Sequence, residues 1–212
     1  MVPARLKPEF EDARRRLLGW RWRRKVRADR FAHFGEQSII YKPIGVLCRH
    51  RIEIGDRVVV QKDAMFSLVE EAHGRIHDPW LRIGDDTHIG PGIWISCVGH
   101  IEIGEHNLLA GNILIADSYH EYQDPDIPIF DQPMADPKPV KIERGCHVGS
   151  GAAILAGVTI GRNSFVAANA VVTRSVPPNS VVVGNPARVI RRYDRERGKW
   201  IDVHEPGGAA FD

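Results

Sequence analysis

The sequence predicts an all-β solenoid, because aliphatic residues return every six positions over long stretches of the chain. The longest series runs without interruption from Ile142 to Val172, and shorter series begin at Ile54, Ile83 and Ile103. Small or β-branched residues form a second column, four positions after each member of the longest series. A period of six is typical of short strands separated by bends, with one aliphatic side chain per unit pointing into a shared interior.

Three such units close one triangular turn of a prism, and successive turns stack as parallel strands about 4.8 Å apart. The aliphatic series predict roughly five or six turns, which makes the prism on the order of 27 Å tall. Cys146 falls in the column of small residues at a bend, so we expect it to be a buried packing residue. A solenoid needs capped ends. We expect residues 35–187 to form the solenoid, with caps at residues 1–34 and 188–212.

The N-terminal cap is strongly basic. Residues 1–34 hold eleven Lys or Arg and four Asp or Glu, a net charge of +7 that the total of +2 conceals. Leu18, Trp22 and Val26 are spaced four apart, which predicts an amphipathic helix. In one interpretation this helix packs over the open end of the solenoid. In the other, residues 10–31 contact an anionic membrane surface or another polyanion.

The composition is that of an ordinary globular protein, with 43% hydrophobic and 26% charged residues. No apolar run is long enough to span a membrane, and we expect no secretory signal in the N-terminal residues. The three cysteines are far apart and form no CxxC pair, which argues against a disulfide framework or a zinc ribbon. We therefore expect a cytoplasmic protein, with the inner face of the membrane as a peripheral alternative. No nucleic-acid partner is expected.

The six-residue period breaks once, between Ile115 and Ile142, where 27 positions replace six. We expect residues 117–139 to leave the solenoid as a loop that contains five prolines and six acidic residues. Long loops that leave a rigid scaffold usually carry function. This loop is therefore the first place to look for a functional site.

The C-terminal repeats, with the runs VGSGAAILAGVTIG, VAANAVVT and VVVGNPARVI, resemble the hexapeptide-repeat acyltransferases. Within that family the chain is most similar to bacterial sugar and polysaccharide O-acetyltransferases, over about residues 40–192. The resemblance implies a left-handed parallel β-helix, extended here by an N-terminal basic helix and a short C-terminal segment. It also implies a homotrimer with sites between subunits. Acyl-coenzyme A would be the co-substrate, with no permanently bound cofactor.

The family places its catalytic histidine where the loop leaves the coil, and the matching position is His120. Acyl transfer from a thioester to an alcohol needs a base for the hydroxyl, and imidazole suits this task because it titrates near neutrality. Glu121, the second candidate catalytic residue, or Asp117 could hold the tautomer of His120. The alternative is that His120 is a solvated loop residue without a catalytic role.

The resemblance also implies a surface for coenzyme A. Backbone amides at small or polar positions would receive the pantetheine arm, and two arginines would lie near the nucleotide phosphates. A solvated tail is the alternative interpretation of the two arginines. The matching positions are Ser150, Ala168, Thr173, Arg174, Arg188 and Arg191.

The acceptor side departs from the family pattern. Gly90 and Val98 stand where sugar acetyltransferases often have Asn and Asp, and His147 stands where they commonly have Trp. These differences leave the identity of the acceptor open. Three aromatic residues are candidates for stacking on a sugar ring. They are Trp94, Tyr119 and Tyr122.

The function expected from these observations is transfer of an acetyl or succinyl group from coenzyme A to a carbohydrate hydroxyl. The carbohydrate would be a polysaccharide, a glycolipid or a precursor of either. N-acylation of an amino-sugar nucleotide or a small amine is the alternative reaction, and a non-catalytic β-helix is the alternative class. No metal is expected, because the histidines in the repeats lack the closely spaced pair of zinc-binding β-helix enzymes. These histidines are His100, His106, His120 and His147.

Overall fold

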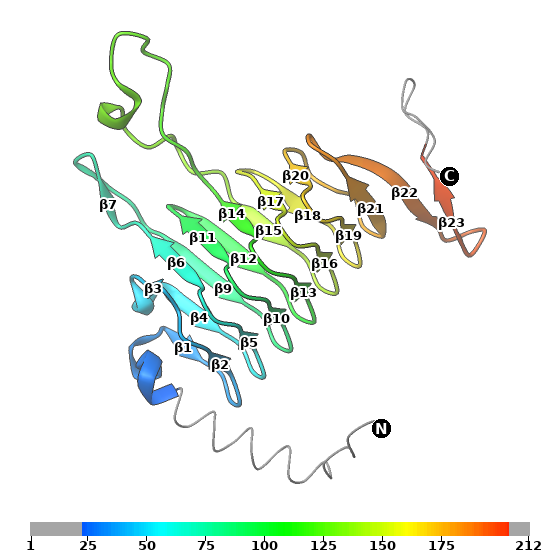
Figure 1. The fold of residues 1–212 in the computed structure, drawn as a ribbon, viewed down its shortest axis with the longest axis horizontal. Helices are drawn as coiled ribbons and strands as arrows, with labels where there is room; N and C mark the ends of the chain where they lie inside the picture. The colour runs from blue at the N-terminus through cyan, green and yellow to red at the C-terminus, as the bar shows by residue number, and fades with distance from the viewer. Residues whose placement is uncertain (1–22, 204–212) are drawn as a thin grey trace.

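The computed structural model of the protein describes residues 23–203. Nearly all of its regular structure is β, and three long sheets wrap around one core (Figure 1). The chain visits the three sheets in turn, so three consecutive strands complete one coil. The sequence prediction of a parallel β-solenoid is confirmed.

Two of the sheets, A and C, have six strands each. Sheet A contains β1 (His33–Phe34), β4 (Ile52–Ile54), β9 (Trp80–Ile83), β12 (His100–Ile103), β15 (Val140–Ile142) and β18 (Thr159–Ile160). Sheet C contains β3 (Gly45–Val46), β6 (Met65–Leu68), β11 (Trp94–Cys97), β14 (Leu114–Ala116), β17 (Ala153–Ile154) and β20 (Val171–Val172).

Sheet B has nine strands, of which the last two form the C-terminal extension. It contains β2 (Ile39–Ile40), β5 (Val59–Val60), β10 (His88–Ile89), β13 (Leu108–Leu109), β16 (His147–Val148), β19 (Phe165–Val166), β21 (Ser180–Val183), β22 (Arg188–Asp194) and β23 (Lys199–Asp202). Strands β2 to β21 pair in parallel, whereas β22 and β23 add to the sheet in antiparallel fashion. The turn from parallel to antiparallel pairing ends the coils at this side of the prism.

The register of the strands explains the six-residue period. Ile103 lies directly opposite Ile83 on one neighbouring strand and Ile142 on the other. All three side chains are fully buried, and their counterparts in the other coils are buried as well. Each such side chain stabilises the fold by about 1.5–3 kcal/mol through removal from water. Cys146 is buried at a bend, as predicted, and burial raises the pKa of its thiol.

The N-terminal end of the prism is covered by residues that precede the first coil. Residues 23–26 are helical, and η1 (Ala28–Arg30) follows. Val26 and Phe31 are buried against the core, and the Arg49 Nε atom donates a hydrogen bond to the Val26 carbonyl at 3.1 Å. Residues 1–22, which hold most of the expected basic helix, lie outside the described part of the chain. Within residues 23–203, no helix has the length and apolar character needed to cross a bilayer.

The turn from sheet C to sheet A is extended twice, although the sequence analysis expected a single break. Residues 69–79 leave the prism between β6 and β9 and form a hairpin of β7 (Glu71–Ala72) and β8 (Arg75–Ile76). Residues 117–139 leave it between β14 and β15 and include η3 (Ile129–Asp131). The first extension was missed because only the gap of 17 positions between Phe66 and Ile83 marks it in the aliphatic series. Figure 1 shows both extensions on the same side of the prism.

Candidate active site

His120 lies in the neck of the 117–139 loop, where the two legs of the loop pair with each other. It forms an isolated antiparallel bridge with Met134. The neighbouring Glu121 amide donates a hydrogen bond to the Pro133 carbonyl at 2.9 Å, and further backbone hydrogen bonds close the neck towards the coil. The legs therefore hold the backbone of His120 in an extended ladder, while its side chain is exposed.

Asp117, the first residue of the loop, anchors the neck to the coil below it. Its carboxylate is fully buried and accepts hydrogen bonds from the amides of Val98 and Gly99, both at 2.8 Å. The Cys97 Sγ atom lies 3.6 Å from the same carboxylate. Burial and the charge of Asp117 raise the pKa of the Cys97 thiol well above its usual range, so the thiol stays protonated. Both oxygens of Asp117 bind the coil below, and no hydrogen bond joins Asp117 to His120 within residues 23–203, so its role in holding the tautomer of His120 stays a prediction.

The imidazole of His120 faces a histidine that the sequence analysis did not select. The ring of His73, at the tip of the β7–β8 hairpin, lies 5.8 Å from the ring of His120 between centroids, at an interplanar angle of 89°. The ring of Phe130, in the loop, lies 6.4 Å from that of His73. Glu121 is half-buried and forms no ion pair with His120 within residues 23–203, so its role as partner stays a prediction. The signal in the sequence that could have pointed to His73 is the gap between Phe66 and Ile83 in the aliphatic series.

The positions expected to receive the pantetheine arm lie at two corners of the prism that flank sheet C. Ser150 and Ala168 occupy the same corner in successive coils, before β17 and β20 respectively. The coils approach closely here, since a Cβ atom on Gly149 would clash with the backbone nitrogen of Ala168. Thr173 and Arg174 occupy the next corner, after β20. All four are exposed, and their backbone amides donate no hydrogen bond within the described residues.

Arg188 and Arg191 both lie on β22, and both side chains are exposed. The Arg191 Nε atom is 2.9 Å from an Asp202 carboxylate oxygen on β23. Arg188 donates a hydrogen bond to the Ala187 carbonyl at 3.0 Å. Within one chain, β22 and the loop that carries His120 lie at different ends of the molecule (Figure 1). A single chain therefore does not bring these arginines to His120.

The aromatic candidates on the acceptor side separate into two groups. Tyr119 and Tyr122 lie beside each other in the loop, with ring centroids 6.1 Å apart. Trp94 lies instead on the outer face of sheet C, on β11. His147 stacks on Phe165 of the next coil at 4.6 Å, on the outer face of sheet B. Its surroundings indicate a packing role away from the loop.

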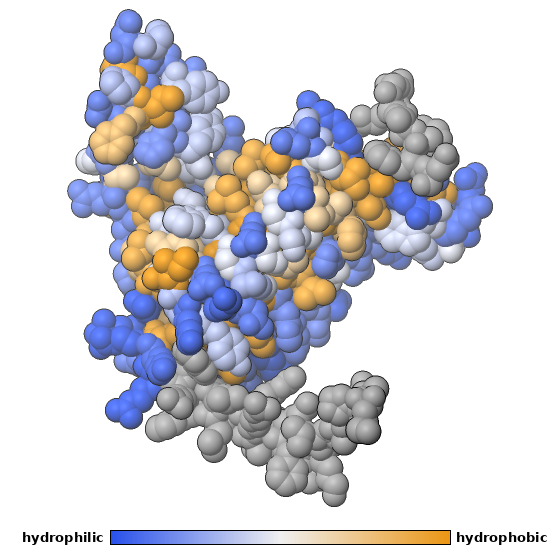
Figure 2. All heavy atoms as spheres, viewed as in Figure 1, coloured by the Kyte–Doolittle hydropathy of each residue, from blue (hydrophilic) through white to orange (hydrophobic). Residues whose placement is uncertain are grey.

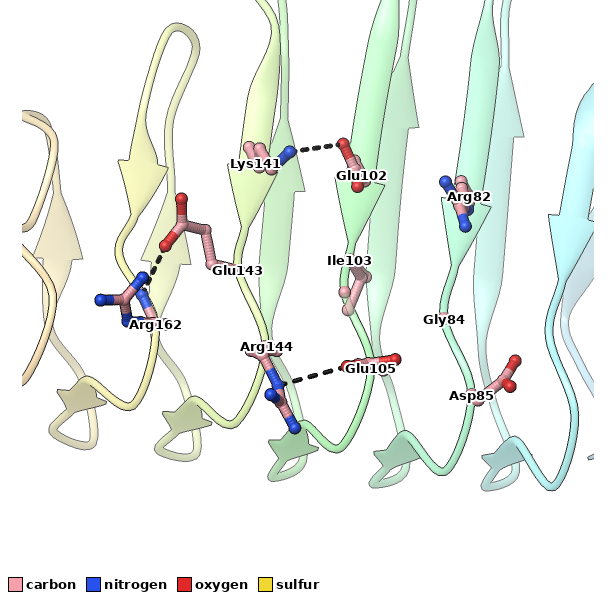
Figure 3. Close-up of a pocket in the computed structure, with 11 residues that line it drawn as sticks. Arg82, Gly84, Asp85, Glu102, Ile103, Glu105, Lys141, Glu143, Arg144 and Arg162 are labelled. Atoms are coloured by element: carbon pink, nitrogen blue, oxygen red, sulfur yellow. Dashed lines mark hydrogen bonds and ion pairs between the residues drawn. The ribbon is translucent and has the colours of Figure 1, made fainter.

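A groove along sheet A is lined by charged side chains of both signs, which neutralise one another. Lys141 contacts Glu102 at 3.0 Å, and Arg144 contacts Glu105 at 3.2 Å (Figure 3). Each pair joins one coil to the next. This groove is therefore a ladder of ion pairs between coils. Within residues 23–203, no group of three or more His, Cys, Asp or Glu side chains is arranged to hold a metal ion.

Comparisons with known proteins agree with this architecture. The family model described as "Bacterial transferase hexapeptide (six repeats)" matches residues 139–174. The galactoside O-acetyltransferase of Escherichia coli is 28% identical over 155 residues, which cover 62% of this chain and 73% of the relative. The chain spans less of three other curated relatives, namely 39%, 46% and 62% of their lengths.

Two solved structures share the fold over most of the chain. The hexapeptide-repeat-containing acetyltransferase VCA0836 from Vibrio cholerae matches with a TM-score of 0.55 and 25% identity, covering 86% of this chain and 92% of that one. The N-acyltransferase AntD from Bacillus cereus, in complex with dTDP and 3-hydroxybutyryl-coenzyme A, matches with a TM-score of 0.65 and 18% identity, covering 82% and 90%. Together with the three parallel sheets, these likenesses identify the fold as the left-handed parallel β-helix expected from the sequence.

Proposed function

We propose that this chain, which belongs to the family of bacterial hexapeptide transferases, transfers an acyl group from coenzyme A to a carbohydrate hydroxyl. The observation that carries the proposal is the exposed imidazole of His120 in a loop neck that a buried carboxylate anchors to the coil. Acyl transfer to an alcohol requires a base that is both held in place and accessible to the hydroxyl. The acyl group in the proposal is acetyl, with succinyl as the second candidate.

In the proposed reaction His120 takes the proton from the acceptor hydroxyl as its oxygen attacks the thioester carbonyl carbon. The carbon–sulfur bond then breaks, and the departing sulfur takes the proton back from the imidazolium. The free amides of Ser150, Ala168, Thr173 and Arg174 would hold the pantetheine arm, since each is exposed and has no partner within residues 23–203. Small side chains at Ser150 and Ala168 let a ligand approach the backbone there. The reaction would take place in the cytoplasm, where acyl-coenzyme A is available.

A screen of donors against acceptors tests the reaction. Acetyl- and succinyl-coenzyme A are crossed with methyl β-galactoside, maltose, a dTDP-linked amino sugar and a simple amine, and free thiol is followed over time. Mass spectrometry and hydroxylamine treatment of the product separate esters from amides. Ester formation supports the proposal. Amide formation would favour N-acylation, a reaction class for which AntD, a neighbour in fold, is named. Thiol release no faster than hydrolysis with every acceptor would favour a non-catalytic β-helix.

We expect the protein to be a homotrimer, because one chain holds the pieces of the proposed site apart. An apolar column on the outside of sheet C offers a contact surface. Trp94 lies opposite Leu114 in the next coil, and these side chains are 49% and 39% exposed. Figure 2 shows hydrophobic residues on the outer face of the coils. Sedimentation equilibrium should give three times the chain mass of 23.8 kDa. A stable monomer at micromolar concentration would contradict the expectation.

Arginine variants on β22 test the coenzyme A surface. We expect Arg188→Ala and Arg191→Ala each to weaken coenzyme A binding by roughly 10- to 100-fold, because a charge-assisted phosphate contact contributes about 1.5–3 kcal/mol. Isothermal titration calorimetry measures the change. Arg192→Ala, on the same strand and also exposed, is the matched control. Asp202→Asn removes the ion-pair partner of Arg191 and should not weaken binding. A wild-type affinity for coenzyme A in both Arg188→Ala and Arg191→Ala would remove the two arginines from the site.

A further inference from the structure

We propose that His73 binds the acceptor, so that the 69–79 hairpin forms one wall of the acceptor site and the 117–139 loop forms the other. This inference rests on the proposed function, and it assigns a residue and a substrate feature to the same site. Both extensions replace the same turn of the prism, from sheet C to sheet A. A single coil, which makes this turn with Val98 and Gly99, separates them. Their bases are therefore only two coil spacings apart, about 10 Å.

The ring at the tip of the hairpin contacts two rings of the 117–139 loop, one in its neck and one further out. His73 meets His120 edge to face at 5.8 Å, and it meets Phe130 at 6.4 Å with an interplanar angle of 77°. His73 is exposed and makes no hydrogen bond within residues 23–203. Its imidazole therefore offers one donor and one acceptor to a ligand that approaches His120. No group in the described chain competes for them.

The conformation of the hairpin places His73 firmly. The turn between the paired residues Ala72 and Arg75 consists of His73 and Gly74, with φ angles of 50° and 71°. Positive φ at both central residues is the requirement of a type I′ turn, which matches the twist of the flanking strands. Histidine is among the non-glycine residues that adopt a positive φ, so the turn accommodates His73 and fixes the direction in which it leaves the backbone.

An arginine from the preceding coil clamps the base of the hairpin. The Arg51 Nε atom lies 3.2 Å from a Glu70 carboxylate oxygen on the first leg, and Arg51 Nη1 lies 2.7 Å from Asp78 on the second. The amide of His77 donates a hydrogen bond to the Glu70 carbonyl at 2.8 Å and closes the ladder between the legs. Contacts of one guanidinium to both legs restrict how far the tip can swing. The hairpin can therefore present His73 to a ligand with little loss of entropy on binding.

The chemistry of these side chains indicates the feature of the acceptor that they recognise. Phe130 is 81% exposed, and its ring provides an apolar face for the C–H face of a sugar ring. His73 contacts both this ring and the ring of His120, so its nitrogens would meet a hydroxyl next to the one that His120 activates. The site therefore favours a pyranoside with a free hydroxyl adjacent to the acylated position. Acceptors that lack this second hydroxyl should bind less well.

Two substitutions at position 73 test this role without disturbing the turn. Glycine and asparagine both accept a positive φ, and only asparagine retains a donor and an acceptor. His73→Gly should raise the KM for the best acceptor of the donor–acceptor screen about 10-fold, the value of one lost hydrogen bond. His73→Asn should recover part of that loss. The KM for acyl-coenzyme A should stay unchanged in both variants. His33→Ala, which removes an exposed histidine on β1, is the control.

An NMR measurement checks the ring contact independently of activity. His73→Gly should shift the imidazole resonances of His120 in a ¹H–¹³C spectrum, because the ring current of His73 is lost, whereas His33→Ala should leave them in place. A wild-type protein that transfers acyl groups, with the same acceptor KM in His73→Gly, would overturn the role of His73 and leave the proposed function intact. A wild-type protein that transfers to no acceptor would overturn the proposed function and the acceptor role together.

Discussion

His120→Ala is expected to lower the turnover of acyl transfer by 10²- to 10⁴-fold, the usual contribution of a positioned general base. The fold should survive, because the side chain is exposed and its removal opens no cavity in the core. The affinity for acyl-coenzyme A should be close to that of the wild type, since the proposed donor surface lies on other coils. Thiol release measures kcat, and thermal unfolding followed by circular dichroism checks the fold.

The outcome separates catalysis from binding. His33→Ala removes an exposed histidine far from the loop and should keep wild-type turnover. Glu121→Gln shows whether the neighbouring carboxylate supports the base, because a loss in kcat without a loss in acceptor affinity would indicate a positioning role. A His120→Ala protein that keeps more than about a tenth of wild-type turnover would overturn the assignment of His120, since a base contributes more than this.

Asp117→Ala is expected to lower the free energy of unfolding by about 2–5 kcal/mol. The substitution leaves the buried amide of Val98 and the partly buried amide of Gly99 without an acceptor, and each unsatisfied group costs about 1–3 kcal/mol. Asp117→Asn should cost less, because one of its two terminal atoms still accepts a hydrogen bond. Urea unfolding measures the change, and Asp136→Ala, an exposed carboxylate in the same loop, serves as the control.

Asp117→Ala should also reduce turnover in the folded protein, because the loop then loses the side-chain part of its attachment to the coil three residues before His120. The activity of a sample that is fully folded by circular dichroism isolates this effect from the loss of stability.

A free energy of unfolding that falls by less than about 0.5 kcal/mol in Asp117→Ala, the range of a neutral surface substitution, would show that the buried contacts of Asp117 contribute little.

The repeat was predictable because each aliphatic position has one structural meaning, an inward side chain opposite its counterpart in the next coil. Ile83, Ile103 and Ile142 illustrate this, since the spacing in sequence becomes direct pairing in sheet A. The break after Ile115 was visible for the same reason. The break after Phe66 is shorter and falls between two separate series, so the aliphatic spacing alone does not distinguish an extension of the chain from a gap in the pattern.

The candidate site was less predictable, because its contacts join segments that are far apart in sequence. His120 was found through its resemblance to a family and its place at the start of a loop. His73 lies 47 positions earlier, and only the stacking of coils brings it beside His120. The direction of Asp117 was equally hidden. An acidic residue near a histidine suggests a catalytic pair. The carboxylate of Asp117 instead accepts hydrogen bonds from two backbone amides of the coil below.

The double extension of one corner also bears on how such a protein can change during evolution. The hairpin and the loop join the prism only at their two ends, and the parallel pairing of the coils continues through β11 and β12 between them. Insertions, deletions or exchanges within either extension therefore leave the inherited scaffold in register. New acceptor preferences can arise by remodelling two surface segments, while the machinery for the donor and the stability of the core are passed on unaltered.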